Sequence, residues 1–268
     1  MSNLVKLGKA FYSSSMAGIG LHQLFYAEFN NMMMPPWPID NTGYTVLAYA
    51  GNLALILAGI KMFSTTKARI TALILGATFL FLCLLSYALY ELILDPYSHH
   101  LPLWTNALKE LAFAGGAFVL AGTSRAPASE TNSTILKGLE KFIPYGHAFF
   151  CITMISFGLM HLLYLEHVSK LVPAWIPFPV FWTALAGIAL IGSGLCIVAK
   201  IKLRLVSNLL ALMIFIWLLI LHIPRAVSTP LLDHGNQVTS AFSALIFVGI
   251  ALMIGNSPPE TSRMKSDA

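Results

Sequence analysis

Two histidine–tyrosine pairs stand near the ends of long apolar stretches. His22 is four residues before Tyr26, and His161 is three residues before Tyr164. On a helix, either spacing places the two rings on the same face. Imidazole and phenol groups can donate hydrogen bonds to a ligand oxygen, and aromatic rings can stack on a flat ligand. The pattern therefore predicts a shared ligand site or, as the plainer alternative, histidines that are satisfied by neighbouring backbone groups or hydroxyls.

Other charged residues stand near the predicted ends of helices. Glu28 and Glu166 occupy the same place in the two stretches. Each is either a solvated carboxylate or the partner of a cation in its own half. His222 is followed one turn later by Arg225, which can anchor to lipid phosphate or pair with Glu166 or Asp233.

Lys109 and Glu110 are adjacent inside a further apolar stretch, about 9 Å from its start at 1.5 Å per residue. As neighbours they point in different directions, so they cannot face one partner together. We expect Glu110 to face the protein interior. Lys109 is expected either to pair with Glu91 or to extend its ammonium group to the surface. Ionisable residues in an apolar helix are costly and mark candidate functional sites.

The composition places these residues in an apolar setting. Of the 268 residues, 57% are hydrophobic and only 10% are charged, whereas soluble domains average about 25% charged residues. The natural solvent for such a chain is a lipid bilayer. The net charge is +5, but the basic residues are scattered rather than clustered. This predicts membrane lipid, and not nucleic acid, as a partner.

The chain contains eight apolar runs that are long enough for a membrane-spanning helix, which needs about 20 residues. The expected fold class is therefore all-α, a polytopic membrane protein with eight transmembrane helices. The runs cover residues 9–29, 43–63, 69–93, 103–122, 143–166, 178–199, 203–223 and 235–255.

Lysine and arginine residues fall almost entirely on one side of this arrangement. The loops of the other side hold only Lys170 and Arg225. Because positively charged loops stay in the cytoplasm, both termini are predicted to be cytoplasmic. The histidines and acidic residues named above then lie toward the outer face of a multi-pass protein.

The sequence also contains an internal repeat, in which residues 11–37 align with residues 149–175 at a constant offset of 138. The identical pairs are Phe11/Phe149, Met16/Met154, Gly20/Gly158, Leu21/Leu159, Leu24/Leu162, Tyr26/Tyr164, Glu28/Glu166, Pro35/Pro173 and Trp37/Trp175. Each half has four spans, so both halves enter the membrane in the same direction. The repeat predicts two parallel four-helix bundles related by a pseudo-twofold axis along the membrane normal.

Four segments follow from this repeat. We predict a first four-helix repeat over residues 1–124 and a polar cytoplasmic linker over 125–138. A second four-helix repeat covers 139–256, and a cytoplasmic tail covers 257–268.

Several motifs resemble those of a known family. "GLMHLLYLEH" is followed by "VPAWIPFPVFWTALAGIALIGSG" and "LLALMIFIWLLILHIPR", and the first half ends in "WTNALKELAFAGGAFVLAG". Together they are similar to the DoxX-like membrane proteins of bacteria, here as a tandem duplication of the four-helix unit. The resemblance implies a bacterial cytoplasmic (inner) membrane. It also implies a link to quinone-coupled sulfur oxidation or thiol-redox complexes, without an agreed set of catalytic residues.

We expect a binding role more than an enzymatic one. The hypothesis is a non-catalytic subunit, or a binder of an apolar, quinone-like molecule, linked to a membrane redox system, with a redox enzyme subunit as its partner. The alternatives are a small-molecule transporter or carrier and a scaffold for a partner enzyme. The predicted ligand-binding residues are His22, Tyr26, Glu28, Glu91, Lys109, Glu110, His161, Tyr164, Glu166, His222 and Arg225. In this hypothesis the first half contributes His22, Tyr26, Lys109 and Glu110 to the pocket, and the second half contributes His161, Tyr164 and His222.

Quinone is the cofactor that suits this residue set. Haem would need two axial ligands. Three of the histidines lie at a similar predicted depth, but no motif supports haem. Cys83, Cys151 and Cys196 stand singly, without a C-x-x-C or a Cys/His metal spacing, so neither a redox dithiol nor a metal site is expected. The sequence also lacks a phosphate-binding loop and a nucleophile elbow.

Overall fold

The structure is a computed structural model of the chain, and it describes residues 2–26, 34–35, 42–64, 67–94, 100–124 and 133–258. Every regular element in these residues is a helix, so the predicted all-α class is confirmed. Six helical segments are long and apolar enough to cross a membrane, which indicates a multi-pass membrane protein. They are Gly43–Phe63, Ala68–Ile93, Thr134–Leu163, Pro179–Val198, Leu203–Ser228 and Asn236–Asn256.

The two remaining predicted spans, 9–29 and 103–122, correspond to α1 (Asn3–Gln23) and α5 (Thr105–Thr123). Neither is among the six apolar segments. Both carry polar side chains into the protein, since Gln23 on α1 and Glu110 on α5 are fully buried. Neighbouring helices shield these groups, which explains why the two helices are less apolar than the rest.

The other helices follow in chain order, and several predicted spans are built from more than one of them. In the first half these are α2 (Thr42–Ser64), α3 (Ala68–Ala77), η1 (Thr78–Cys83), α4 (Leu84–Ile93) and η2 (Leu101–Trp104). In the second half they are α6 (Thr134–Glu140), η4 (Ile143–Tyr145), α7 (Gly146–Leu163), α8 (Leu165–Ser169), α9 (Pro179–Val198), α10 (Leu203–Trp217), η5 (Leu218–His222), α11 (Ile223–Ser228) and α12 (Asn236–Asn256).

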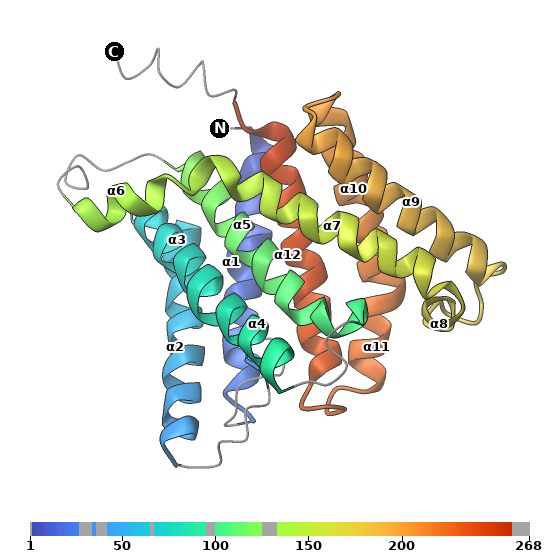
Figure 1. Cartoon of the computed structure of the whole chain (residues 1–268), viewed down its shortest axis with the longest axis horizontal. Coiled ribbons are helices and arrows are strands. Elements are labelled where there is room, and N and C mark those ends of the chain that lie inside the picture. Colours follow the sequence, from blue (N-terminus) through green and yellow to red (C-terminus); the bar gives the residue numbers. More distant parts are fainter. Residues whose placement is uncertain are drawn as a thin grey trace.

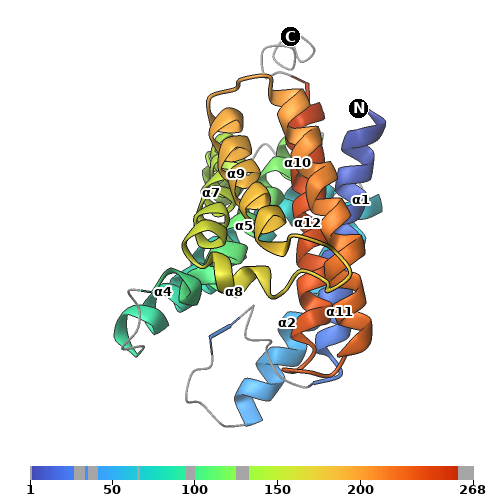
Figure 2. The same ribbon diagram turned by 90° about the vertical axis from the view of Figure 1, so that its right-hand side faces the viewer.

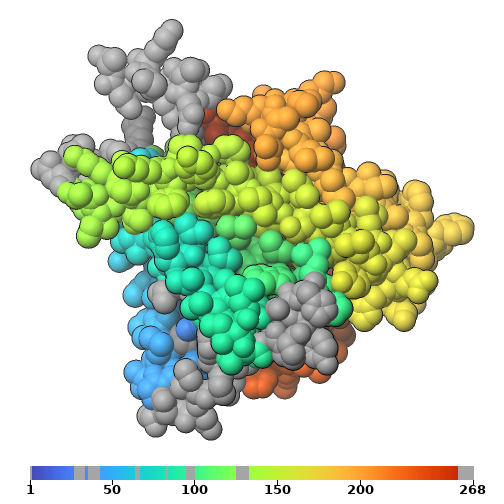
Figure 3. All heavy atoms as spheres, in the orientation of Figure 1, coloured from blue at the N-terminus to red at the C-terminus, as the bar shows by residue number. Residues whose placement is uncertain are grey.

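Helices of the two halves pack against each other as closely as helices of one half. α1 lies along α2 and α12, and α5 lies along α3 and α7 and also contacts α12 (Figure 1). α7 crosses the front of the molecule in the space-filling view (Figure 3). Thus the first helix of each half packs beside the last helix of the other half.

Glycines bring these helices together. A Cβ atom on Gly8 of α1 would lie 2.6 Å from the carbonyl oxygen of Gly249 on α12. A Cβ atom on Gly115 of α5 would lie 2.5 Å from the carbonyl oxygen of Gly146 on α7. Only glycine allows such a close approach of two backbones.

Both chain ends lie at one end of the molecule, where the Ser2 hydroxyl donates to the Asn256 carbonyl oxygen at 3.5 Å. Ser2 also begins α1, because its Oγ accepts from the backbone N–H of Val5 at 3.3 Å. We call this the terminal end and the opposite one the far end. α1 and α7 run toward the far end, and α5 and α12 start there (Figure 2).

An aromatic cluster fills the centre between the halves. The Tyr12 hydroxyl donates to the Phe113 carbonyl oxygen at 2.7 Å, which ties α1 to α5. Phe247 of α12 contacts Phe113 and Phe150, with ring centroids 6.0 and 6.2 Å apart. Tyr12, Phe113 and Phe150 are fully buried, so this contact is the shared core of both halves.

Each half contains one π-helical segment within its third predicted span. η1 follows α3, and η5 follows α10. A π segment widens one helical turn and shifts the direction of the side chains beyond it. Only η5 supplies residues to the site that follows.

Candidate functional site

A cavity of about 680 Å³ lies in the far half of the molecule, between α5, α7, α9, α10 with η5, and α12. α8 and the residues after it line its far end, through His167, Val168, Leu171 and Val172. Four of the predicted ligand-binding residues line it: Lys109, His161, Tyr164 and His222. The cavity therefore gathers side chains from both halves of the sequence.

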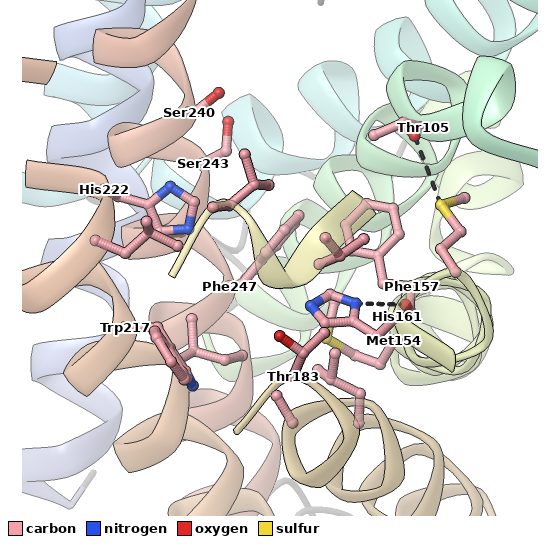
Figure 4. Close-up of a pocket in the computed structure, with 18 of the residues that line it drawn as sticks. Thr105, Met154, Phe157, His161, Thr183, Trp217, His222, Ser240, Ser243 and Phe247 are labelled. Carbon is pink, nitrogen blue, oxygen red and sulfur yellow. Dashed lines mark hydrogen bonds between the residues drawn. The ribbon is translucent and has the colours of Figure 1, made fainter. Parts of the chain in front are cut away.

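His161 is held by its own helix. Its Nδ1 lies 2.7 Å from the carbonyl oxygen of Phe157, one turn earlier on α7 (Figure 4). A carbonyl only accepts, so Nδ1 carries the proton in this bond. In the neutral ring, Nε2 is then an acceptor with no hydrogen-bond partner among the described residues. The alternative prediction, a histidine whose hydrogen bonds are satisfied by the backbone, therefore holds for Nδ1 but leaves Nε2 available to a ligand.

His222 enters the cavity from the last residue of η5, and it approaches the same space as His161 (Figure 4). Its ring makes no hydrogen bond with any residue that the structure describes. Trp217, the last residue of α10, lines the cavity beside it. The π segment connects these two residues, so it sets how the imidazole and the indole face the cavity.

Lys109 faces the cavity, and its neighbour Glu110 does not. The ammonium nitrogen donates to Asn106 Oδ1 at 3.4 Å, one turn earlier on α5. Glu110 is fully buried on the other side of the helix, where its charge acts on Tyr12 of α1. The predicted divergence of the two side chains is confirmed. The predicted ion pair of Lys109 with Glu91 does not form, and Glu91 is buried on α4 outside the cavity lining.

Hydroxyl groups complete the polar part of the lining. Thr105 and Thr183 donate to backbone carbonyl oxygens at 2.6 and 2.9 Å. Ser243 donates to the carbonyl oxygen of Thr239 at 2.8 Å. The hydroxyls of Tyr164 and Ser240 have no hydrogen-bond partner within the described residues and line the cavity. They can bond to a ligand.

The floor of the cavity is apolar. Met154, Leu190, Met213, Ile214 and Phe247 line its deeper part, near the middle of the helices. No polar side chain of the described lining continues toward the terminal end below them. The site is therefore an apolar chamber with polar groups near its far end.

His22 and Tyr26 do not line this cavity, contrary to the pocket expected from the sequence. They pack against the residues that precede α12, with the Tyr26 ring between His22 and His234 at centroid distances of 5.3 and 5.9 Å. Gln23 Nε2 donates to Thr239 Oγ1 at 3.2 Å and lies 3.3 Å from His22 Nδ1. The prediction grouped Lys109 with His22 because both belong to the first half. In the structure, α5 packs on α7, and Lys109 lines the cavity beside α7.

The acidic residues of the prediction are not brought together. Glu28 lies outside the described residues, and Glu166 is exposed in the first turn of α8. Arg225 Nε donates to Gln237 Oε1 at 3.2 Å, so α11 is fastened to α12. Of the two alternatives for Arg225, no pairing with Glu166 or Asp233 forms within the described residues, and anchoring to lipid phosphate stays a prediction.

A second cavity of about 460 Å³ lies between α2 and the α3–η1 segment. Its lining is largely apolar, with Lys61 near the terminal end. Asn52 lines it with 2% of its surface exposed, and its Nδ2 has no hydrogen-bond partner in the described part of the chain.

Several cavity residues were missed by the sequence analysis. Trp217 and Leu221 are spaced four apart, and Ser240 and Ser243 three apart, so each pair shares a helix face. That spacing was the available signal. These residues carry no charge, however, and the same spacing is common in any packed helix.

Comparison of the chain with protein-family models, curated proteins and solved structures finds no match. The resemblance to DoxX-like proteins therefore stays a prediction.

Proposed function

We propose that this protein binds an apolar small molecule of the quinone type in the 680 Å³ cavity. It would act as a non-catalytic subunit of a membrane redox system. The cavity itself carries the proposal. Small-molecule sites in proteins have volumes of roughly 300–1,000 Å³ and combine apolar walls with a few polar groups that fix orientation. This cavity has an apolar floor and polar side chains at one end.

The polar groups match the oxygens of a quinone or quinol. Lys109 and Tyr164 can donate to a ring carbonyl, and His161 Nε2 can accept from a quinol hydroxyl. Phe157 and Trp217 offer aromatic faces for the ring. The floor suits an isoprenoid tail.

The membrane arrangement is part of the same proposal. We infer eight crossings, with α1 and α5 as the two that other helices shield, and a pseudo-twofold relation between the halves. The glycine contacts support it: Gly8 and Gly146 are 138 residues apart, as in the repeat, and each meets the last helix of the other half. The DoxX-like resemblance adds a bacterial inner membrane to the proposal, and the distribution of basic residues adds that both termini lie in the cytoplasm.

The transporter alternative has less support. A transporter needs a route to both membrane faces, and polar groups usually line such a route. The apolar floor made by Met154, Leu190 and Ile214 interrupts one here. A scaffold role for a partner enzyme needs no cavity at all.

Tryptophan fluorescence tests the proposal. A short-chain benzoquinone or naphthoquinone, added to the purified protein in detergent, should quench the emission saturably, because Trp217 lines the cavity. Trp217→Phe should remove most of the saturable part. Trp182→Phe is the matched control. Trp182 lies on α9 outside the cavity lining, and its Nε1 donates to the carbonyl oxygen of Pro177. Quenching that never saturates, or that is the same in both variants, would refute the proposal.

A further inference from the structure

The ionisable side chains that line the cavity are all basic, apart from the tyrosine hydroxyl. They are Lys109, His161, His167 and His222, and the described lining contains no aspartate or glutamate. Each comes from a different element: α5, α7, α8 and η5. Four separate parts of the chain thus place basic groups around one apolar chamber.

Lys109 is the costliest of these groups. Its ammonium has one hydrogen bond among the described residues, a long one of 3.4 Å to the neutral amide of Asn106. Glu110 faces the opposite side of α5 and does not line the cavity. A cation in an apolar chamber loses several kcal/mol of solvation. The charge of Glu110 across the helix offsets part of this loss, and an anion placed against Lys109 inside the cavity offsets more of it.

His222 lies in the same positive region. Lys109 and Arg225 are close enough for their charges to act on its ring. The ring nitrogens of His222, Nε2 of His161 and the hydroxyl of Tyr164 have no partners within the described residues. The chamber therefore offers a ligand the Lys109 ammonium and the donors of His222 and Tyr164, and its described lining contains no acidic side chain.

We infer that the ligand carries an ionised acidic oxygen when bound, as an amphiphilic organic anion with a carboxylate or an acidic ring hydroxyl. This inference rests on the proposed function, because it assigns the chemistry of the ligand in the same cavity. The anionic head lies between Lys109 and His222, and the apolar body extends toward Met154 and Leu190. A neutral quinone fits the volume but leaves Lys109 without a counter-ion inside the cavity.

Two matched ligand pairs test this. A 3-alkyl-2-hydroxy-1,4-naphthoquinone, which is ionised at neutral pH, is compared with its 2-methoxy ether. A long-chain fatty acid is compared with its methyl ester in a displacement assay. We expect the ionised member of at least one pair to bind about tenfold tighter, as for a charge-assisted hydrogen bond. Which pair shows the preference separates a ring hydroxyl from a carboxylate.

Substitution of the lysine completes the test. Lys109→Met should abolish the preference, because it should lower the affinity for the ionised ligand about tenfold and leave the affinity for its neutral partner unchanged. Lys109→Arg should keep it. Lys170→Met, an exposed lysine of the far end, is the control and should change neither ligand.

The outcomes separate the two proposals. If the wild-type protein binds the acid and its neutral partner with equal affinity, the inference of an anionic ligand is wrong, while the proposed function stands. Binding of no member of either pair removes both. The wild-type comparison decides the inference even if a Lys109 variant does not fold.

Discussion

At the scale of single residues, the far end of α1 depends on the absence of a side chain at Gly235. This residue precedes α12 with φ of 73°, after Asp233 and His234 at 48° and 53°. Asp233 and His234 are strained in the left-handed region, because side chains disfavour it, whereas glycine adopts it freely at position 235. A Cβ atom at Gly235 would clash with Cε1 of the His22 ring. The turn is therefore built around the His22 ring.

Gly235→Ala should destabilise the protein, because it adds left-handed strain to a clash with His22. We expect a loss of about 2 kcal/mol or more in the free energy of unfolding. The melting temperature in detergent measures it. Gly192→Ala is the control, since Gly192 lies in α9 with no atom within 4 Å of its added Cβ. It should be neutral or stabilising by up to about 1 kcal/mol. Equal melting temperatures for the two variants would show that the His22 contact is unimportant.

At the scale of secondary-structure elements, η5 directs His222 into the cavity, and α8 supplies part of the lining at its far end. A π segment holds one residue more than an α-helical turn of the same rise. Removing that residue restores the α-helix and turns the following side chains by about 100°. The direction of His222 is thus a property of the element as much as of the residue.

Deletion of Leu219, an exposed residue of η5, should rotate His222 away from the cavity. We expect the protein to fold and its ligand affinity to fall roughly tenfold, the loss of about one hydrogen bond. Deletion of Phe81 in η1, the π segment outside this cavity, is the matched control and should leave affinity unchanged. Circular dichroism checks the helix content of both. If ligand affinity is unchanged after the Leu219 deletion, η5 does not position His222 for binding.

The sequence predicts the helices better than their partners. Apolar length locates α2, α9 and α12 closely, because each must cover about the thickness of a bilayer. It does not show that α5 packs on α7, so Lys109 was assigned to the wrong neighbours. The π segments were also missed, since no residue type specifies them. His161, Tyr164 and His222 were predicted from charge and aromaticity in an apolar run, which are signals that survive without knowledge of packing.

At the scale of the whole molecule, the halves are interlocked rather than simply adjacent. α1 reaches across to α12 and α5 reaches across to α7, so the first helix of each half packs more extensively on the last helix of the other half than on that of its own half. The cavity is built at one of these crossings, since α5 of the first half supplies Lys109. A separated second half would lack that residue.

The proposed membrane orientation rests on the distribution of basic residues and is testable in cells. The three native cysteines are replaced by alanine, and either Gly138→Cys or Trp175→Cys is introduced. Trp175 is 72% exposed at the far end, so we expect a membrane-impermeant maleimide to label that position in intact cells. Position 138 should react only after the membrane is opened. Labelling in the reverse order would place the termini outside.

The most direct test of the central claim is a comparison of what the purified protein carries. Organic extracts of the wild type and of Ala244→Trp are analysed by mass spectrometry; Ala244 lines the cavity, and the indole would fill it. Val180→Phe, on an exposed face of α9, is the control. The account predicts one apolar compound in the wild type and the control that is depleted in Ala244→Trp. Equal amounts in all three proteins, or no such compound in the wild type, would contradict it.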